Sequence, residues 1–322
     1  MISFLKIIRV KQLLIIAFMQ YVIRWCLVFP LLKAQSSYYQ LQLSEFHFFL
    51  LVLSTILIAA AGYIINDYFD VKIDKINKPE KILIDNGVKR RVSIVSHIIF
   101  NFLALFIVLY LSFSVGLTKL AFIQFICVSG LWFYSTTFKK QFLIGNLIIA
   151  LFTALVPFLV VMYEILPCYK AYLPLDENFS FSAIWLYLTG ISLFLFLITL
   201  INEIVKDMES YDGDIYFGYN TMPIVIGIKL SKLVLILIAI IIIIIFLSYY
   251  QILQLKNNDW ITFFYFLVLL QLPLLLFIYK IIKAETKEAF QKTIVIIQII
   301  MLSGICYLFL FAYILLRFIH LL

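Results

Sequence analysis

The feature that most constrains this chain is its series of apolar runs, each about twenty residues long. A helix of that length spans the hydrocarbon core of a bilayer, so each run is long enough for one crossing. With 65% hydrophobic and 13% charged residues, the composition excludes an ordinary soluble globule. The sequence therefore predicts an all-α fold, a polytopic membrane helical bundle.

The runs predict about nine transmembrane helices in a single membrane domain that covers residues 1–322. No polar interval between them is long enough for a separate soluble domain. The boundary between the third and fourth spans is the least marked, because it rests on Gly116, Thr118 and Lys119. The expected spans are Leu13–Leu32, Phe46–Ile65, Val92–Val115, Leu120–Phe138, Leu143–Leu166, Phe181–Ile201, Leu233–Leu253, Trp260–Ile281 and Thr293–Leu316.

The first of two acidic stretches, Asn66–Asp74, follows directly on an apolar run. If the helix continues, Asp67, Asp70 and Asp74 lie at i, i+3 and i+7 and share one face. Carboxylates at the carboxyl end of a helix meet its negative dipole end, so a bound cation would stabilise them. Oxygen ligands without nearby cysteine or histidine favour a hard ion that also binds phosphate, Mg2+ or alternatively Mn2+.

The second acidic stretch, Asn202–Asp214, also follows an apolar run and repeats the spacing with Asp207, Ser210 and Asp214. The middle acid of the first stretch is a serine here. Either stretch alone could consist of solvated loop residues. The matched positions of the two, in a chain so poor in charge, favour a shared function.

Most of the 25 lysines and arginines lie in the amino-terminal tail and in alternate loops, on the side that carries both acidic stretches. By the positive-inside rule we expect the active site to lie on the cytoplasmic side of the membrane. The abundance of Ile, Lys, Asn, Phe and Tyr is typical of an AT-rich bacterial genome, so we expect a multi-pass protein of a bacterial inner (plasma) membrane. The net charge of +8 then reflects topology, and nucleic acid is not an expected partner. The two stretches would converge on one metal-bound diphosphate, with Lys139, Lys140 and Lys206 neutralising phosphate charge. Arg24 falls inside the first span.

A metal-held diphosphate beside an apolar, aromatic-rich helical chamber suits prenyl transfer. Mg2+ would stabilise the departing diphosphate while an acceptor attacks the allylic cation on the isoprenoid chain. Aromatic faces would stabilise that cation, and the apolar surroundings would exclude water. A cation-coupled transporter is the rival from another class, although its acids would be expected within the spans. The four scattered cysteines indicate neither a disulfide framework nor a zinc site.

Several motifs, in the right order along the chain, resemble those of the UbiA superfamily of intramembrane prenyltransferases. Asn66–Asp74 is similar to the first aspartate-rich motif in full, and Lys75–Pro79 resembles its usual continuation. The segment Tyr134–Asn146 resembles the YS, LK and GN pattern between the two motifs, and Thr221–Gly227 resembles a TLPIxxG ending. The resemblance implies a bundle of nine helices, an Mg2+ cofactor, a prenyl diphosphate donor and a lipid-like or aromatic acceptor in the lipid bilayer.

Within that superfamily, the residues around both motifs look most like the geranylgeranylglycerol-phosphate geranylgeranyltransferase branch. The branch implies a geranylgeranyl donor and a prenylglycerol phosphate acceptor. Prenylation of an aromatic ring, as in the quinone and haem-side branches, stays open as the alternative.

The resemblance also implies a set of site residues. The residues expected to hold Mg2+ through the diphosphate are Asp67, Asp70, Asp74, Asp207 and Asp214. The candidates for diphosphate contacts are Asn66, Lys139, Lys206 and Arg9. The sequence departs from the branch at Ser210, which replaces the middle aspartate, and at Asn202 and Asn220, where arginines are common. Weaker binding, a different acceptor or an inactive copy are all consistent with these departures, and Glu209 or Asp212 would be the acids able to compensate.

Overall fold

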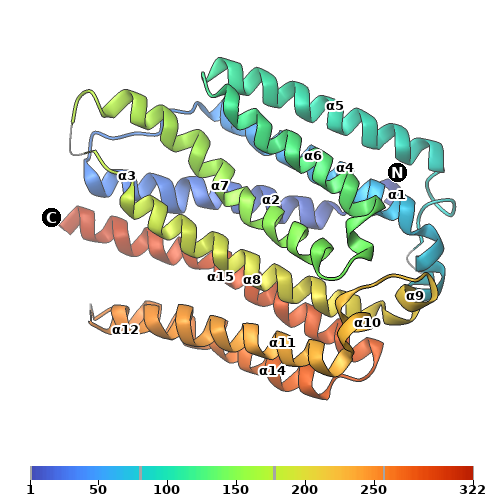
Figure 1. Ribbon diagram of the computed structural model, residues 1–322. Coiled ribbons are helices and arrows are strands. Elements are labelled where there is room, and N and C mark those ends of the chain that lie inside the picture. Colours follow the sequence, from blue (N-terminus) through green and yellow to red (C-terminus); the bar gives the residue numbers. More distant parts are fainter. Residues whose placement is uncertain (1, 80–81, 177–178, 257, 322) are drawn as a thin grey trace. The chain divides into compact units, whose positions relative to one another are not determined.

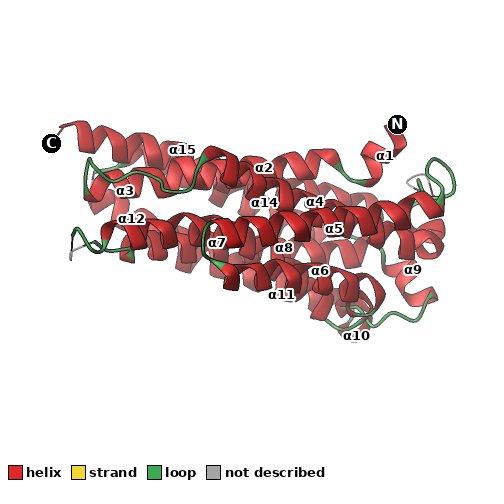
Figure 2. Cartoon of the chain, turned by 90° about the horizontal axis from the view of Figure 1, so that it is seen from above, coloured by secondary structure: helices red, strands yellow, loops and turns green. Residues whose placement is uncertain are grey.

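The structure is a computed structural model that describes residues 2–79, 82–176, 179–256 and 258–321 (Figures 1 and 2). Within these ranges the regular structure is helical, apart from one isolated bridge between Ile84 and Val88. The all-α class predicted from the sequence is therefore confirmed.

Seven helical segments of the described chain are long and apolar enough to cross a membrane, which confirms an integral, multi-pass protein. They are Val10–Gln35, Glu45–Asn77, Arg90–Ser114, Ile144–Tyr172, Ser182–Glu209, Trp260–Lys283 and Lys287–Arg317. The predicted count of nine is not confirmed. The fourth predicted span corresponds to a helix of only 16 residues. The seventh, Leu233–Leu253, is helical but includes side chains that lie outside the described residues.

The chain divides into two compact units. The first contains Met1–Lys139 and Leu155–Leu188, and the second contains Lys140–Ala154 and Thr189–Leu322. Helices α7 (Ile144–Tyr172) and α8 (Ser182–Glu209) each begin in one unit and end in the other. Each acidic stretch can therefore be described within a single unit.

The first unit is built on long helices that follow the predicted spans. Besides parts of α7 and α8, its elements are α1 (Ile2–Ile7), α2 (Val10–Ile23), η1 (Arg24–Val28), α3 (Phe29–Gln35), α4 (Glu45–Asn77), α5 (Arg90–Ser114), η3 (Thr118–Leu120), α6 (Ala121–Thr136) and the start of η4 (Phe138–Lys140). Ser44 caps the start of α4, because its hydroxyl accepts a hydrogen bond from the backbone N–H of His47. Gly62 on α4 lets Leu131 of α6 approach closely, since a Cβ built there would lie 3.0 Å from the leucine side chain.

A buried ion pair lies inside the first unit, although the sequence indicated only that Arg24 falls within a span. The Nε atom of Arg24 is 2.8 Å from Glu164 Oε1, and both side chains are almost fully buried. A second guanidinium nitrogen lies 2.9 Å from Glu45 Oε2, and the third donates to the carbonyl of Leu43 at 2.6 Å. The guanidinium also stacks on the Phe48 ring, 4.3 Å from its centroid. The buried Arg24 charge is thus paired with two carboxylates, a carbonyl and a ring, as burial of a charge requires.

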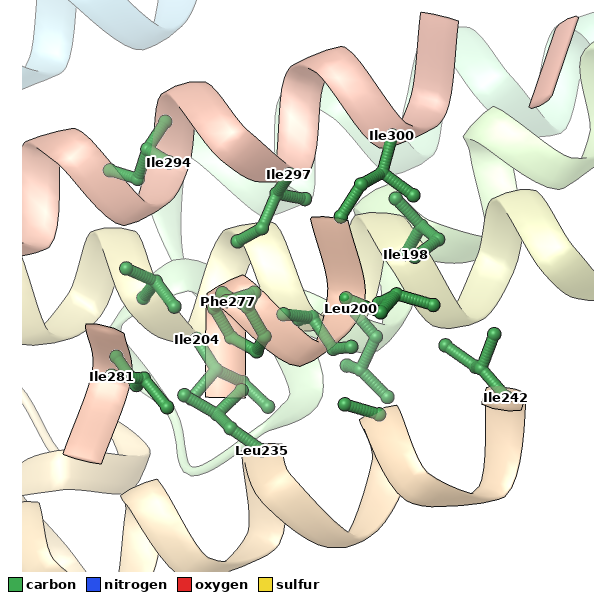
Figure 3. Packing of buried hydrophobic residues seen from close by; sticks show 14 of the residues in the cluster. Ile198, Leu200, Ile204, Leu235, Ile242, Phe277, Ile281, Ile294, Ile297 and Ile300 are labelled. Carbon is green, nitrogen blue, oxygen red and sulfur yellow. The ribbon is translucent and has the colours of Figure 1, made fainter. Parts of the chain in front are cut away.

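The second unit has an apolar core that supports the end of α8 (Figure 3). Its remaining elements are α9 (Tyr211–Tyr216), α10 (Met222–Ile226), α11 (Ile228–Ile241), η5 (Ile242–Ser248), α12 (Tyr249–Lys256), α13 (Trp260–Phe266), η6 (Leu267–Gln271), α14 (Leu272–Lys283) and α15 (Lys287–Leu321). Ile204 of α8 is fully buried and packs in one cluster with Leu235 of α11, Phe277 of α14 and Ile297 of α15. This packing fixes the last turns of α8, where Asp207 lies.

Candidate functional site

The first acidic stretch lies on one continuous helix. Helix α4 runs to Asn77, well beyond the apolar run, so Asp67, Asp70 and Asp74 share a face as the spacing predicted. The side-chain amide of Asn66 donates to Asp70 Oδ2 at 2.8 Å. This local bond orients the central carboxylate of the three.

Two cations lie against these carboxylates. The guanidinium of Arg9 is 2.8 Å from Asp67 Oδ1, and it stacks on the Tyr63 ring at 4.9 Å from the centroid. The ammonium of Lys139, from η4, forms an ion pair with Asp70 and also donates to the Asn66 side-chain oxygen at 3.4 Å. The Lys139 side chain is only 8% exposed, so its charge is held at this place. The structure therefore brings Arg9 and Lys139, two of the predicted diphosphate contacts, to the first stretch.

The backbone at the amino terminus explains how Arg9 reaches Asp67. Arg9 separates α1 from α2 and has a left-handed conformation, with φ 53° and ψ 55°. A non-glycine residue in this region costs about 1 kcal/mol or more, so the surrounding packing must impose it. Ile7, which is buried, belongs to a small cluster with Ile64 and Val71 of α4. That anchor holds α1 against α4, and the turn directs Arg9 to the acidic face.

The second acidic stretch is divided between two helices. Helix α8 ends at Glu209 and α9 begins at Tyr211, so the chain turns at Ser210. The amide of Asn146, near the start of α7, donates to Asp207 Oδ2 at 2.8 Å. The hydroxyl of Ser210 donates to Asp214 Oδ2 at 2.9 Å, and Asp214 is buried. Both predicted carboxylates of this stretch thus accept a hydrogen bond from a neutral side chain.

The other charged residues of the second stretch have separate surroundings. Lys206, a predicted diphosphate contact, pairs with Glu203 at 2.6 Å on its own helix. Glu209 accepts a hydrogen bond at 2.9 Å from Gln291 of α15, and Asp212 is exposed. The turn at Ser210 separates Glu209 from α9, so its carboxylate is directed to α15.

Two residues with contacts at these stretches were given no function from the sequence. Asn146 was noted in the sequence only as part of a Gly-Asn pair, and Tyr63 was not singled out. A lone amide that opens an apolar run is a signal that would have identified Asn146. No comparable signal marks Tyr63, because the ring is common in this chain.

The donor atoms suit Mg2+ that also binds a substrate. Within the described ranges, no three histidine, cysteine, aspartate or glutamate side chains are arranged to hold a metal by themselves. Mg2+ is typically bound through one or two carboxylates together with substrate phosphates and water, rather than by a complete protein cage. The carboxylates of the two stretches fit that mode. The stretches belong to different units, and their convergence on one diphosphate stays a prediction.

Comparison with known proteins decides the family. The model of the UbiA prenyltransferase family matches residues 27–304, most of the chain. The chain belongs to the UbiA prenyltransferase family. Membership confirms the resemblance seen in the motifs and the enzyme class they indicated, a prenyltransferase.

Curated relatives and a solved structure of the UbiA family agree with this assignment. A digeranylgeranylglyceryl phosphate synthase of Sulfurisphaera tokodaii is 36% identical over 188 residues, which are 56% of this chain and 59% of that relative. One of Saccharolobus solfataricus is 32% identical over 257 residues, which are 77% of this chain and 79% of that relative. The match thus covers less than two thirds of the first relative's length and more than two thirds of the second's. A UbiA homologue of Archaeoglobus fulgidus, solved with GPP and Mg2+, has the same fold, with a TM-score of 0.54, 16% identity and coverage of 94% and 98% of the two chains.

Proposed function

We propose that the protein transfers a geranylgeranyl group from its diphosphate to a prenylglycerol phosphate in the membrane, with Mg2+ as cofactor. The observation that carries the proposal is the first acidic stretch, where Asp67 and Asp70 lie beside Arg9 and Lys139. Anionic ligands for a metal and cationic ligands for phosphate are thus adjacent. The relatives named digeranylgeranylglyceryl phosphate synthase support this acceptor, and the homologue with GPP and Mg2+ supports this donor and metal.

Each site residue has a definite part in this reaction. The ligands that would hold Mg2+ through the diphosphate are Asp67, Asp70, Asp74, Asp207 and Asp214. When bound, Mg2+ supplies positive charge that stabilises the diphosphate as it departs. Arg9 and Lys139 would turn from their carboxylates to the diphosphate oxygens, while Asn66 keeps Asp70 oriented. Lys206 is a candidate for the same anion, once its ion pair with Glu203 opens.

The transfer itself needs an apolar environment. Cleavage of the bond between carbon and the diphosphate oxygen leaves an allylic cation, which water would destroy if it had access. The hydroxyl of the glycerol phosphate attacks that carbon, gives its proton to the released diphosphate and forms an ether. We further propose that both acidic stretches lie on the cytoplasmic side, because the basic residues gather on that side of the spans. The membrane we propose is a bacterial inner membrane, because the abundance of Ile, Lys, Asn, Phe and Tyr is typical of an AT-rich bacterial genome.

Prenyl transfer is tested with membranes that contain the protein and labelled geranylgeranyl diphosphate. Geranylgeranylglyceryl phosphate and an aromatic acid are offered in parallel, with Mg2+ or with a chelator. We expect labelled product only with Mg2+ and only from the glycerol phosphate. Labelling of the aromatic acid would replace the proposed acceptor, and labelling that survives the chelator would contradict the Mg2+ assignment.

Arg9→Gln is expected to raise the KM for the prenyl diphosphate about tenfold, with a smaller change in kcat. The reason is the loss of one charged contact to the diphosphate. The effect of this loss is modest because the Arg9 side chain is 38% exposed, and solvent weakens the contact. Donor titrations in the same membranes measure the effect. Lys11→Gln, a change at an exposed cation two residues away, is the matched control. An unchanged KM in Arg9→Gln would remove Arg9 from the diphosphate site.

A further inference from the structure

The second acidic stretch holds its carboxylates with neutral hydrogen-bond donors, whereas the first combines the Asn66 amide with two cations. In the first stretch, cationic side chains lie against the acids. In the second, an amide and a hydroxyl donate to Asp207 and Asp214. We propose that Asn146 and Ser210 are positioning residues, which fix these two carboxylates in the orientation that the Mg2+-bound diphosphate needs. This inference rests on the proposed function.

Asn146 acts on Asp207 from another helix. It lies near the start of α7, is 7% exposed, and donates its amide N–H to Asp207 Oδ2 at 2.8 Å. A hydrogen bond from a buried, neutral donor restricts rotation of the carboxylate without cancelling its charge. The amide thus adds no positive charge that would compete with a divalent ion for the carboxylate.

Ser210 acts on Asp214 within the second stretch. It occupies the turn between α8 and α9, where its hydroxyl donates to Asp214 Oδ2 at 2.9 Å. An ionised aspartate at this position has no hydrogen to donate, and its charge would repel the carboxylate of Asp214. Serine therefore permits a close approach that an acid would oppose. The residue that interrupts the motif is a donor to one of its two remaining acids.

The turn at Ser210 also affects the neighbouring acid, Glu209. Glu209, which precedes Ser210, accepts a hydrogen bond from Gln291 of α15. That bond directs the Glu209 carboxylate to α15, as the turn at Ser210 allows. The second stretch therefore presents Asp207 and Asp214, each with a neutral donor, as a preorganised pair with less mutual repulsion than three acids.

The test measures Mg2+-dependent binding of a nonreactive donor analogue, geranylgeranyl thiolodiphosphate, to the purified full chain in detergent. Removal of a ligand's supporting hydrogen bond typically lowers metal affinity 10- to 100-fold. We therefore expect Ser210→Ala and Asn146→Ala each to raise the half-saturating Mg2+ concentration by about that factor. Ser210→Thr retains the hydroxyl and is expected to stay near wild type. Asn146→Asp brings a like charge to Asp207 and is expected to be worse than Asn146→Ala.

Controls separate positioning from folding. Ser231→Ala removes a buried hydroxyl of the second unit, which donates to the Gly227 carbonyl at 2.9 Å, and should leave the Mg2+ dependence unchanged. Thermal unfolding of each variant reports a merely structural effect, which would lower the melting temperature without moving the Mg2+ dependence. Such a pattern in Ser210→Ala and Asn146→Ala would overturn the inference.

Two further outcomes distinguish this inference from the proposed function. Wild-type protein that binds the analogue without any Mg2+ dependence would overturn the proposed function itself. Normal Mg2+ dependence in Ser210→Ala, with tighter Mg2+ binding in Ser210→Asp, would show that this position has only lost a metal-binding aspartate and that the serine positions nothing. That result would overturn the positioning role and leave the prenyl transfer intact.

Discussion

Asp70→Ala is expected to lower kcat/KM for prenyl transfer about 100-fold or more, with the protein still folded in the membrane. Asp70 is the central acid of the first stretch, and it accepts contacts from both Asn66 and Lys139. Its removal takes away a metal ligand and also leaves Lys139, which is largely buried, without its carboxylate partner. Both losses act on the diphosphate, the group whose departure the enzyme must stabilise.

The isosteric change Asp70→Asn separates charge from packing. Asparagine fills the same volume and retains an oxygen that can accept the Asn66 amide bond, yet it cannot neutralise a divalent ion. We expect it to be nearly as inactive as Asp70→Ala while unfolding at a temperature close to wild type. Asp85→Asn, at an exposed acid that pairs with Arg90 at 3.4 Å, is the control for lost charge alone. Near-normal turnover in Asp70→Asn would exclude Asp70 as a metal ligand.

The first stretch was predictable because its geometry is local. Spacing alone placed Asp67, Asp70 and Asp74 on one face, and that prediction required only that α4 continue beyond the apolar run. The partners of these acids are not local. Arg9 is 58 residues from Asp67 in sequence, and Lys139 is 69 residues from Asp70. Resemblance to a family named both cations as candidates, but only the fold pairs each with its carboxylate.

The second stretch shows where pattern reasoning ends. Its spacing matches the first, yet the chain turns at Ser210 and divides the acids between α8 and α9. Packing and side-chain hydrogen bonds decide such a turn, and the relevant partners, Asn146 and Gln291, lie far away in sequence. The count of nine spans is not confirmed for a related reason. Hydropathy finds apolar runs but does not fix helix length, and α6 has only 16 residues.

Arg24→Leu is expected to destabilise the protein by about 3–5 kcal/mol, because it leaves Glu164 as a buried acid without its cation. Glu164→Leu should have a similar effect, since it leaves Arg24 without its fully buried partner carboxylate. The double variant Arg24→Leu/Glu164→Leu removes both charges together. It should recover most of the loss, because replacing a whole buried pair with apolar side chains is often close to neutral.

A double-mutant cycle, measured by denaturant unfolding in detergent micelles, gives the coupling between the two residues. Glu45→Gln is the control within the same cluster. Its side chain is 67% exposed, so losing that ion pair should cost under about 1 kcal/mol. Strictly additive effects of Arg24→Leu and Glu164→Leu would contradict the prediction. Arg24 would then be held by the Leu43 carbonyl and the Phe48 ring rather than by its buried partner, and η1 would owe its stability to those contacts.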